Sequence, residues 1–247
     1  MKSNNILMVV DSGNTRLKWQ GKSKSGRISR GNVAVREINN LSGRWKVLAK
    51  PDRLLIANVA GSVVEAQLIE ICYELWRLTP FFIKATSFSC GVTNCYDEPD
   101  KLGADRWASL IGAYNIYRED CLIASLGTAT TIDTLHSDGR FLGGVILPGF
   151  DLMKSSLSKA VPSLSVPEGR IVQLPRSTPD AISTGILIAV VGAVKELRSQ
   201  ITCERGMEPK LIFCGGHAGR IAGAFKEESV IHQHLVIDGL LKIGQLG

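Results

Sequence analysis

Two acidic residues lie where a carboxylate could do chemistry, and Asp11 is the first. It follows the apolar run 6–10 and precedes Gly13, so it stands at the end of an expected strand, beside a tight turn. A carboxylate beside a glycine turn repels phosphate unless a cation intervenes, which favours hydrated Mg²⁺ held by Asp11, with Lys18 as a direct positive charge. The alternative is an Asp that only caps the turn, the commoner role of Asp before Gly.

The second is Asp105, which precedes Arg106 near the start of a helix expected over 103–117. Together they offer a base that can accept a hydroxyl proton and a guanidinium that can hold a carboxylate or phosphate in a fixed fork. The alternative is a first-turn acid that complements the helix dipole, next to a surface cation.

The elements that must position these residues come in two similar sets. The segments 9–15 and 123–129 both run from an apolar strand through x-x-Gly into small polar residues, 114 residues apart. In each half strands come first and helices later, which predicts two α/β lobes, 1–117 and 118–247, rather than one continuous parallel sheet. Two such turns facing each other would clamp a phosphate chain.

Apolar runs and periodicity give a coarse map of the elements. A Ser-x-x-Glu pattern at Ser62–Glu65 predicts a capping box before the first long helix. We expect strands at 6–10, 15–19, 54–59, 81–84, 121–125, 141–147 and 210–214. We expect helices at 62–77, 103–117, 151–160 and from about 179 to 199.

Composition and missing motifs exclude several classes of protein. The 247 residues are 45% apolar with a net charge of +6, which is typical of a folded globular protein. There is no P-loop, dinucleotide fingerprint, Gly-x-Ser-x-Gly elbow or His-Glu-x-x-His. Six cysteines without a C-x-x-C pair favour reduced core residues in the cytoplasm, and no apolar stretch is long enough for a membrane helix. The basic residues are scattered along the sequence, so nucleic acid is an unlikely partner.

An ordered set of motifs resembles the type III pantothenate kinases, members of the acetate and sugar kinase, heat-shock ATPase and actin superfamily. The motifs are Asp-x-Gly-Asn-Thr-x-x-Lys at 11–18, Tyr-x-x-Pro-x-x-Leu-Gly-Ala-Asp-Arg at 96–106, Gly-Thr-Ala-Thr-Thr at 127–131, Gly-Gly-x-Ile-x-Pro-Gly at 143–149 and Gly-Gly-His-Ala at 215–218. The resemblance implies two ribonuclease-H-like (actin-like ATPase) lobes with mixed sheets flanked by helices. It further implies a cytoplasmic homodimer that phosphorylates pantothenate with ATP, giving 4'-phosphopantothenate in the first step of coenzyme A synthesis.

The resemblance also assigns roles to individual residues. Asp105 would be the general base, and Asp11 would hold Mg²⁺ through water. The residues implied to bind ATP are Asp11, Ser12, Gly13, Asn14, Thr15, Arg16, Leu17, Lys18, Thr128, Gly215 and Gly216. Those implied to bind pantothenate are Tyr96, Gly103, Ala104, Asp105, Arg106 and, reaching in from the partner subunit, Thr178.

Two departures from the family pattern carry expectations of their own. Ser125 stands where the family has an Asp that binds a monovalent cation such as K⁺ or NH₄⁺, so we expect weaker or altered cation activation. Ser12 replaces an apolar residue, which changes the packing under the turn. Two other functions stay open: a catalytically silent member acting as an accessory regulator, and another small-molecule kinase of the superfamily.

Overall fold

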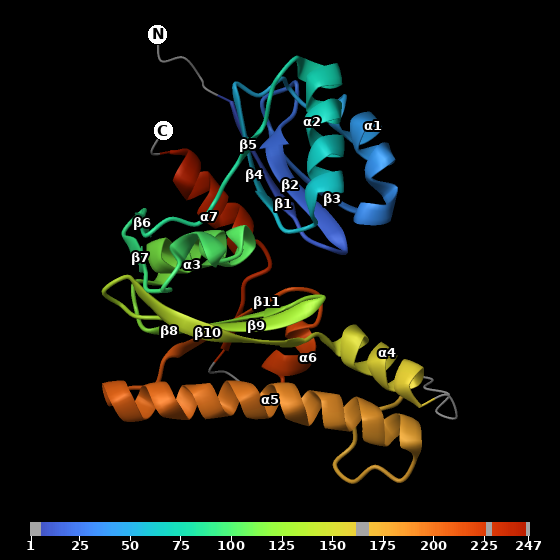
Figure 1. Ribbon diagram of the computed structural model, residues 1–247, viewed down its shortest axis with the longest axis vertical. Coiled ribbons are helices and arrows are strands. Elements are labelled where there is room, and N and C mark those ends of the chain that lie inside the picture. Colours follow the sequence, from blue (N-terminus) through green and yellow to red (C-terminus); the bar gives the residue numbers. More distant parts are fainter. Residues whose placement is uncertain (1–5, 162–167, 226–228, 246–247) are drawn as a thin grey trace. The chain divides into compact units, whose positions relative to one another are not determined.

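The computed structural model describes residues 6–161, 168–225 and 229–245, and its backbone contacts divide the chain into two compact units. The first comprises the chain up to Tyr117 together with the residues from His234 onward, and the second runs from Arg118 to Gln233. Figure 1 shows the elements of each unit. No described helix is long and apolar enough to cross a membrane.

The sheet of the first unit has the strand order β3-β2-β1-β4-β5. β1 pairs antiparallel with β2 on one side and parallel with β4 on the other. The strands of this sheet are β1 (Leu7–Ser12), β2 (Arg16–Lys22), β3 (Ile28–Ala34), β4 (Arg53–Asn58) and β5 (Phe81–Phe82). The short strands β6 (Phe88–Ser89) and β7 (Val92–Asn94) pair antiparallel with each other and are not part of this five-stranded sheet. The helices are η1 (Val35–Asn40), α1 (Leu41–Trp45), α2 (Ser62–Trp76), η2 (Pro99–Lys101), α3 (Ala104–Tyr117) and α7 (Leu235–Gly244).

One face of this sheet packs against α1 and α2 around three tryptophans. The ring of Trp45 lies 5.5 Å from that of Trp76 in a stacked arrangement and 6.1 Å from that of Trp19, edge to face. All three are buried together with Met8 and Val10 of β1. We call this set the tryptophan core, and its burial fixes which residues of β1 point away from it.

The other face packs against α3 and α7, where Val9 of β1 meets Ala108 of α3 and Leu240 of α7. The two helices touch at glycines: a Cβ on Gly239 would lie 1.8 Å from the carbonyl oxygen of Ala108, and one on Gly112 would lie 2.5 Å from that of Leu235. This packing fixes the position of α3, the helix that carries Asp105.

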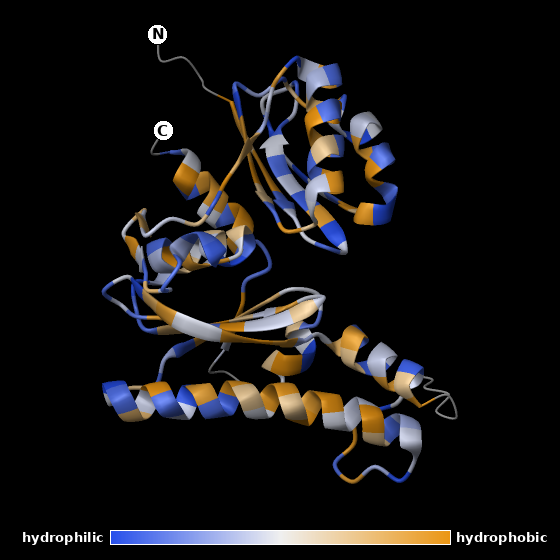
Figure 2. Cartoon of the chain, in the orientation of Figure 1, coloured by the Kyte–Doolittle hydropathy of each residue, from blue (hydrophilic) through white to orange (hydrophobic). Residues whose placement is uncertain are grey.

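Helix α7 is where the structure differs from the predicted lobes. The sequence assigns the whole of 118–247 to the second lobe, but α7 packs in the first unit. Its residues are apolar almost all round, as its orange colour in Figure 2 shows, and they complete the core between the sheet and α3. The place of α7 in the sequence does not predict that it packs in the first unit, because it follows the elements of the second unit directly.

The second unit repeats the strand pattern of the first. β8 pairs antiparallel with β9 and parallel with β11, as β1 does with β2 and β4, in the order β12-β11-β8-β9-β10. The strands are β8 (Cys121–Leu126), β9 (Ala129–Leu135), β10 (Arg140–Pro148), β11 (Lys210–Cys214) and β12 (Ser229–Ile231). The helices are α4 (Phe150–Ala160), α5 (Thr178–Arg205) and α6 (Ala218–Ala222).

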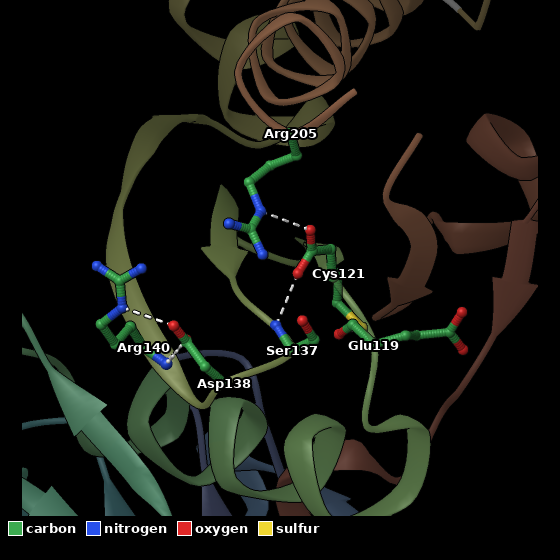
Figure 3. Close-up of polar contacts among 7 residues, drawn as sticks. Glu119, Cys121, Ser137, Asp138, Arg140 and Arg205 are labelled. Atoms are coloured by element: carbon green, nitrogen blue, oxygen red, sulfur yellow. Dashed lines mark hydrogen bonds and ion pairs between the residues drawn. The ribbon is translucent and has the colours of Figure 1, made fainter. Parts of the chain in front are cut away.

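A polar network holds one end of this unit (Figure 3). Asp120 accepts hydrogen bonds from Nε of Arg205, at the end of α5, over 3.0 Å and from the backbone N–H of Ser137 over 2.7 Å. Beside it, Arg140 pairs with Asp138 at 2.8 Å on the surface. The first contact ties the longest helix to the start of β8.

Two predictions about local structure are wrong. Ser62 is the first residue of α2 rather than its cap: Gly61 caps the helix, and no side-chain cap bond forms there. The six cysteines are free, but Cys95 and Cys203 are exposed instead of lying in a core. The expected strands and helices otherwise appear within a few residues of their predicted bounds.

Candidate functional site

Asp11 lies on the side of the first sheet that faces away from the tryptophan core. Strand side chains alternate, so Val10 enters that core while Val9 and Asp11 point to the opposite face. Burial raises the pKa of Asp11 to about 6; the charge of Lys18 opposes this rise and that of Asp105 adds to it. Because the charge of Asp105 raises the pKa of Asp11, the two predicted carboxylates lie close enough in the first unit to influence each other.

The turn after Asp11 is held by backbone hydrogen bonds. The N–H of Gly13 donates to the carbonyl of Arg16 over 3.2 Å, and the carbonyl of Thr15 accepts the N–H of Val35 over 2.9 Å. Asn14 and Thr15 are exposed, so an anion can reach this turn from solvent. Two predicted ATP-binding residues, Ser12 and Leu17, have fully buried side chains. They could contact ATP through their backbone and not through their side chains.

Lys18 is the cross-strand partner of Asp11, because β1 and β2 pair antiparallel with these two residues in register. It is partly buried, and its charge is the main influence that lowers the pKa of Asp11. Arg16, the first residue of β2, is exposed and donates from Nη2 to Oδ1 of Asn32 on β3. This edge of the sheet therefore presents positive charge next to the glycine turn.

Asp105 occupies the first turn of α3, where its carboxylate folds back on the backbone. Oδ1 accepts the N–H of Arg106 over 2.8 Å, and a Cβ on Gly103 would lie 2.8 Å from the same oxygen. Burial raises the pKa of Asp105; the Arg106 N–H and guanidinium oppose this rise without cancelling it. A partly buried carboxylate with a raised pKa suits a general base better than an exposed one does.

Arg106 is buried, with 7% of its surface exposed, and it holds Tyr96. Nη1 donates to the hydroxyl of Tyr96 over 2.9 Å, and the guanidinium lies 5.6 Å from the centre of that ring. Asn94, also buried, accepts the N–H of Tyr96 over 3.1 Å and donates to the carbonyl of Pro99 over 3.0 Å. The pantothenate residues predicted in 96–106 therefore form one connected group.

The glycine turn of the second unit is enclosed by two segments from elsewhere in that unit. Gly149 donates its N–H to the carbonyl of Thr128 over 2.9 Å, and its Cβ would lie 2.1 Å from the carbonyl oxygen of Gly127. From the other segment, Gly215 has φ +92° and its Cβ would lie 2.5 Å from the carbonyl oxygen of Leu126. Only glycine fits either position.

These two segments also contact each other. The ring of His217 stacks on Phe150 at 5.0 Å, and its Nε2 lies 3.3 Å from Oδ2 of Asp151. Thr128 and Gly216 are left exposed at this place, so the structure gathers the predicted nucleotide residues of the second unit around one turn. Ser125 lies just before that turn and is paired across the strands with Thr131, whose buried hydroxyl has no hydrogen-bond partner among the described residues.

Thr178 lies at the start of α5. It is exposed at the first position of α5, after the cap Ser177, whose hydroxyl accepts the N–H of Asp180 over 3.3 Å. With Leu157 and Ile182 it lines a hollow between α4 and the start of α5. The described neighbours of Thr178 in this hollow belong to α4, to the start of α5 and to the segment before it, and not to the second glycine turn.

Comparison with known proteins decides the family. The model of the type III pantothenate kinase family matches residues 7–200. A type III pantothenate kinase from Nitrosospira multiformis is 36% identical over 242 residues, which cover 98% of this chain and 92% of the relative. The chain belongs to the type III pantothenate kinase family. The family resemblance read from the motifs is confirmed, and with it the assignment as a phosphotransferase.

Solved structures agree on the fold of this pantothenate kinase family member. A putative Baf family transcriptional activator from Campylobacter jejuni is 21% identical, with a TM-score of 0.63, and the match covers 97% of this chain and 98% of that one. An archaeal actin homolog is 11% identical, with a TM-score of 0.51, and covers 98% and 100%. The predicted actin-like class, with two mixed sheets flanked by helices, is confirmed.

Sequence reasoning missed residues that support the predicted site residues through contacts and are not themselves expected to touch a ligand. Asn94, Gly149 and His217 support Tyr96 and the second glycine turn, but none was proposed for this role. Asn two residues before a loop Tyr is a recognisable Asx-turn signal. Gly149 contacts a turn about 20 residues earlier in the chain, and His217 contacts Asp151, 66 residues earlier. No local pattern predicts either contact.

Proposed function

We propose that this chain catalyses phosphoryl transfer from ATP to the primary hydroxyl of pantothenate, with Asp105 as the general base. The observation that carries the proposal is Asp105 itself, partly buried at the start of α3, beside Arg106 and within electrostatic reach of Asp11. The products are 4'-phosphopantothenate and ADP. This is the activity named by the family, the first committed step towards coenzyme A.

Each group of the first unit has one task in the proposed reaction. Asp105 accepts the hydroxyl proton as the oxygen attacks the γ-phosphorus and the bond to the β-phosphate oxygen breaks. Arg106 and Tyr96 bind the pantothenate carboxylate, and Arg106 is positioned for this by its own bond to the Tyr96 hydroxyl. The exposed turn residues Asn14 and Thr15, with Lys18, bind the ATP phosphates.

The residues at the first turn fit a magnesium ion brought in with ATP. Asp11 offers carboxylate oxygens, the ligands that Mg²⁺ prefers, and because burial raises the pKa of Asp11 to about 6, a bound cation would favour its ionised form. Bound there through water, Mg²⁺ would neutralise charge on the transferring phosphates. The charge of Lys18 lowers the pKa of Asp11 but does not cancel the rise caused by burial.

The monovalent cation is a separate proposal for the second unit. Ser125 and its cross-strand neighbour Thr131 offer hydroxyl oxygens and no carboxylate of their own. Neutral oxygens bind K⁺ or NH₄⁺ less strongly than a carboxylate does, so we propose weak or altered activation by these ions. We further propose nucleotide contacts by Thr128, Gly215 and Gly216, and a cytoplasmic homodimer to which Thr178 contributes pantothenate contacts.

The test is a coupled assay of ADP release with Mg-ATP and pantothenate, run with and without K⁺ or NH₄⁺. Because a positioned base contributes about 10² to 10⁴ in rate, Asp105→Asn should lower kcat by that factor while the protein stays folded and binds ATP. Asp100→Asn, which changes an exposed carboxylate of the neighbouring 3₁₀ turn, is the matched control.

Near-normal turnover of Asp105→Asn would remove the base assignment. No pantothenate-dependent turnover by folded wild-type protein, under any cation, would overturn the kinase proposal itself. A steep K⁺ dependence of the kind expected from a carboxylate site would contradict the role given to Ser125.

A further inference from the structure

The positive charge of this chain is concentrated in one part of the first unit. The segment 16–53 holds eleven of the 29 Lys and Arg residues but two of the 23 Asp and Glu residues, a formal charge of +9, and the remainder of the chain carries −3. The segment covers β2, β3, η1 and α1 (Figure 1). The catalytic proposal uses only Lys18 and the turn beside it.

Folding brings five of these cations to the end of the β2–β3 hairpin. The N–H of Ala49 donates to the carbonyl of Lys22 over 2.9 Å, that of Lys24 donates to the carbonyl of Val47 over 3.3 Å, and Ser23 bridges to Leu48. The hairpin end and the chain after α1 therefore lie side by side. We call the resulting surface the basic cluster; its members are Lys22, Lys24, Arg27, Lys46 and Lys50.

The cluster is exposed and is not neutralised. Four of its side chains are exposed, and that of Lys22 is partly buried. Across the described parts of the chain, no carboxylate forms an ion pair with any of the five. β2 runs from the glycine turn at Arg16 to Lys22, so the cluster lies roughly 20 Å of strand away from the phosphate-binding turn. Binding of the ATP phosphates does not explain it.

The chemistry of the cluster fits a phosphate backbone better than a protein or a membrane. Protein interfaces have an apolar core and are poor in Lys. This surface is rich in Lys, and Val47 and Ile28 are two isolated exposed apolar side chains rather than an apolar core. A membrane-surface helix would need an exposed apolar face, but α1 is five residues long and buries its Leu41 and Trp45. Nucleic acid phosphates are recognised by Lys and Arg without any apolar contact.

We propose that the basic cluster binds the phosphate backbone of duplex nucleic acid without reading its sequence. The expectation that nucleic acid is an unlikely partner rested on basic residues scattered along the chain; the hairpin and the segment after α1 bring them together in space. The cluster is separate from the groups proposed for catalysis, so nucleic acid binding and kinase activity are independent in this proposal.

The test is fluorescence anisotropy with labelled duplexes of about 30 base pairs, DNA and RNA of one sequence, at salt concentrations from about 50 to about 200 mM. With about 0.9 ions released per neutralised phosphate, five contacts predict a slope of log K against log salt of about −4 to −5. Lys24→Glu/Arg27→Glu/Lys46→Glu should weaken binding at least about 100-fold and flatten the slope by about 3.

The matched control reverses three exposed lysines outside the cluster, Lys84→Glu/Lys159→Glu/Lys195→Glu, with the same change in net charge. It should bind duplexes nearly as wild type does, and both variants should keep their melting temperature and kcat. Equal loss of binding in the two variants, wild-type binding without a salt slope, or binding to vesicles with anionic lipid but not to either duplex would each overturn the proposal.

Discussion

At the scale of single residues, the ionised carboxylate of Asp11 destabilises the ligand-free fold, because burial disfavours its charged form. Burial holds the pKa of Asp11 at about 6, against 3.8 for an unperturbed Asp, so the folded state binds a proton more readily than the unfolded state does. The cost of folding with the ionised group is therefore absent below about pH 4, grows as the pH rises through 6, and reaches at most about 3 kcal/mol above it.

Asp11→Asn should for that reason stabilise the ligand-free protein at pH 8 and leave its stability unchanged near pH 4. Urea denaturation at both pH values measures the difference. The same variant should lose most of the additional stability that Mg-ATP gives to wild type. A variant that is less stable than wild type at pH 8 would show that Asp11 is compensated by groups other than Lys18.

Ser12, next to it on β1, points the other way, towards the tryptophan core. Its Oγ is buried and finds no hydrogen-bond partner in the part of the chain that the structure describes. Because an unsatisfied buried polar group costs about 1 to 3 kcal/mol, Ser12→Ala should raise the free energy of unfolding by about 1 kcal/mol once the lost packing is subtracted. Since only the backbone of Ser12 can reach a ligand, KM for ATP should be the same in the variant and in wild type. A variant less stable than wild type would show that the Ser12 hydroxyl has a hydrogen-bond partner after all.

At the scale of elements, the start of α4 supports the second glycine turn. Gly149 has φ −72°, which any residue can adopt, so the effect of a side chain there is purely steric. A Cβ would meet the carbonyl oxygens of Gly127 and Thr128 at 2.1 and 2.5 Å, and the turn would have to move. Gly149→Ala should weaken binding of a fluorescent ADP analogue by about tenfold or more, the effect of about 1.4 kcal/mol.

Gly192→Ala is the matched control for this substitution. Gly192 lies inside α5 with no atom within 4 Å of its added Cβ, so alanine there should stabilise the helix by about 0.5 to 1 kcal/mol and leave ADP affinity unchanged. Equal ADP affinity of Gly149→Ala and wild type would mean that the turn does not bind the nucleotide or that it tolerates the shift.

The elements also show what sequence reasoning can reach. The first glycine turn and the helix of Asp105 were found because each is a local pattern, an apolar run followed by Gly or by helical spacing. The return of α7 to the first unit could not be found, since its apolar residues fit any core equally well. The cap of α2 was misassigned because Ser-x-x-Glu is weak evidence, and Gly61 takes the position instead.

At the scale of the whole molecule, the network at Asp120 makes the second unit sensitive to acid. Burial alone would raise the pKa of Asp120, but the hydrogen bonds from Arg205 and Ser137 outweigh it and lower the pKa. A lowered pKa means that the carboxylate stabilises the fold above the pKa of the unfolded state, and that this contribution is lost as the pH falls through the folded pKa.

Asp120→Asn should therefore lower the free energy of unfolding by about 1 to 3 kcal/mol at pH 7, the usual contribution of hydrogen bonds to a charged group. The difference from wild type should begin to narrow below about pH 4 and should close as the pH falls through the lowered pKa of the folded state. Asp138→Asn provides the comparison, because its pair with Arg140 is half exposed on both sides and contributes at most about 1 kcal/mol. Denaturation of both variants from pH 7 to pH 3 separates them. If the Asp120 gap persists unchanged in acid, the carboxylate acts through packing rather than charge, and α5 is held to β8 by its apolar face alone.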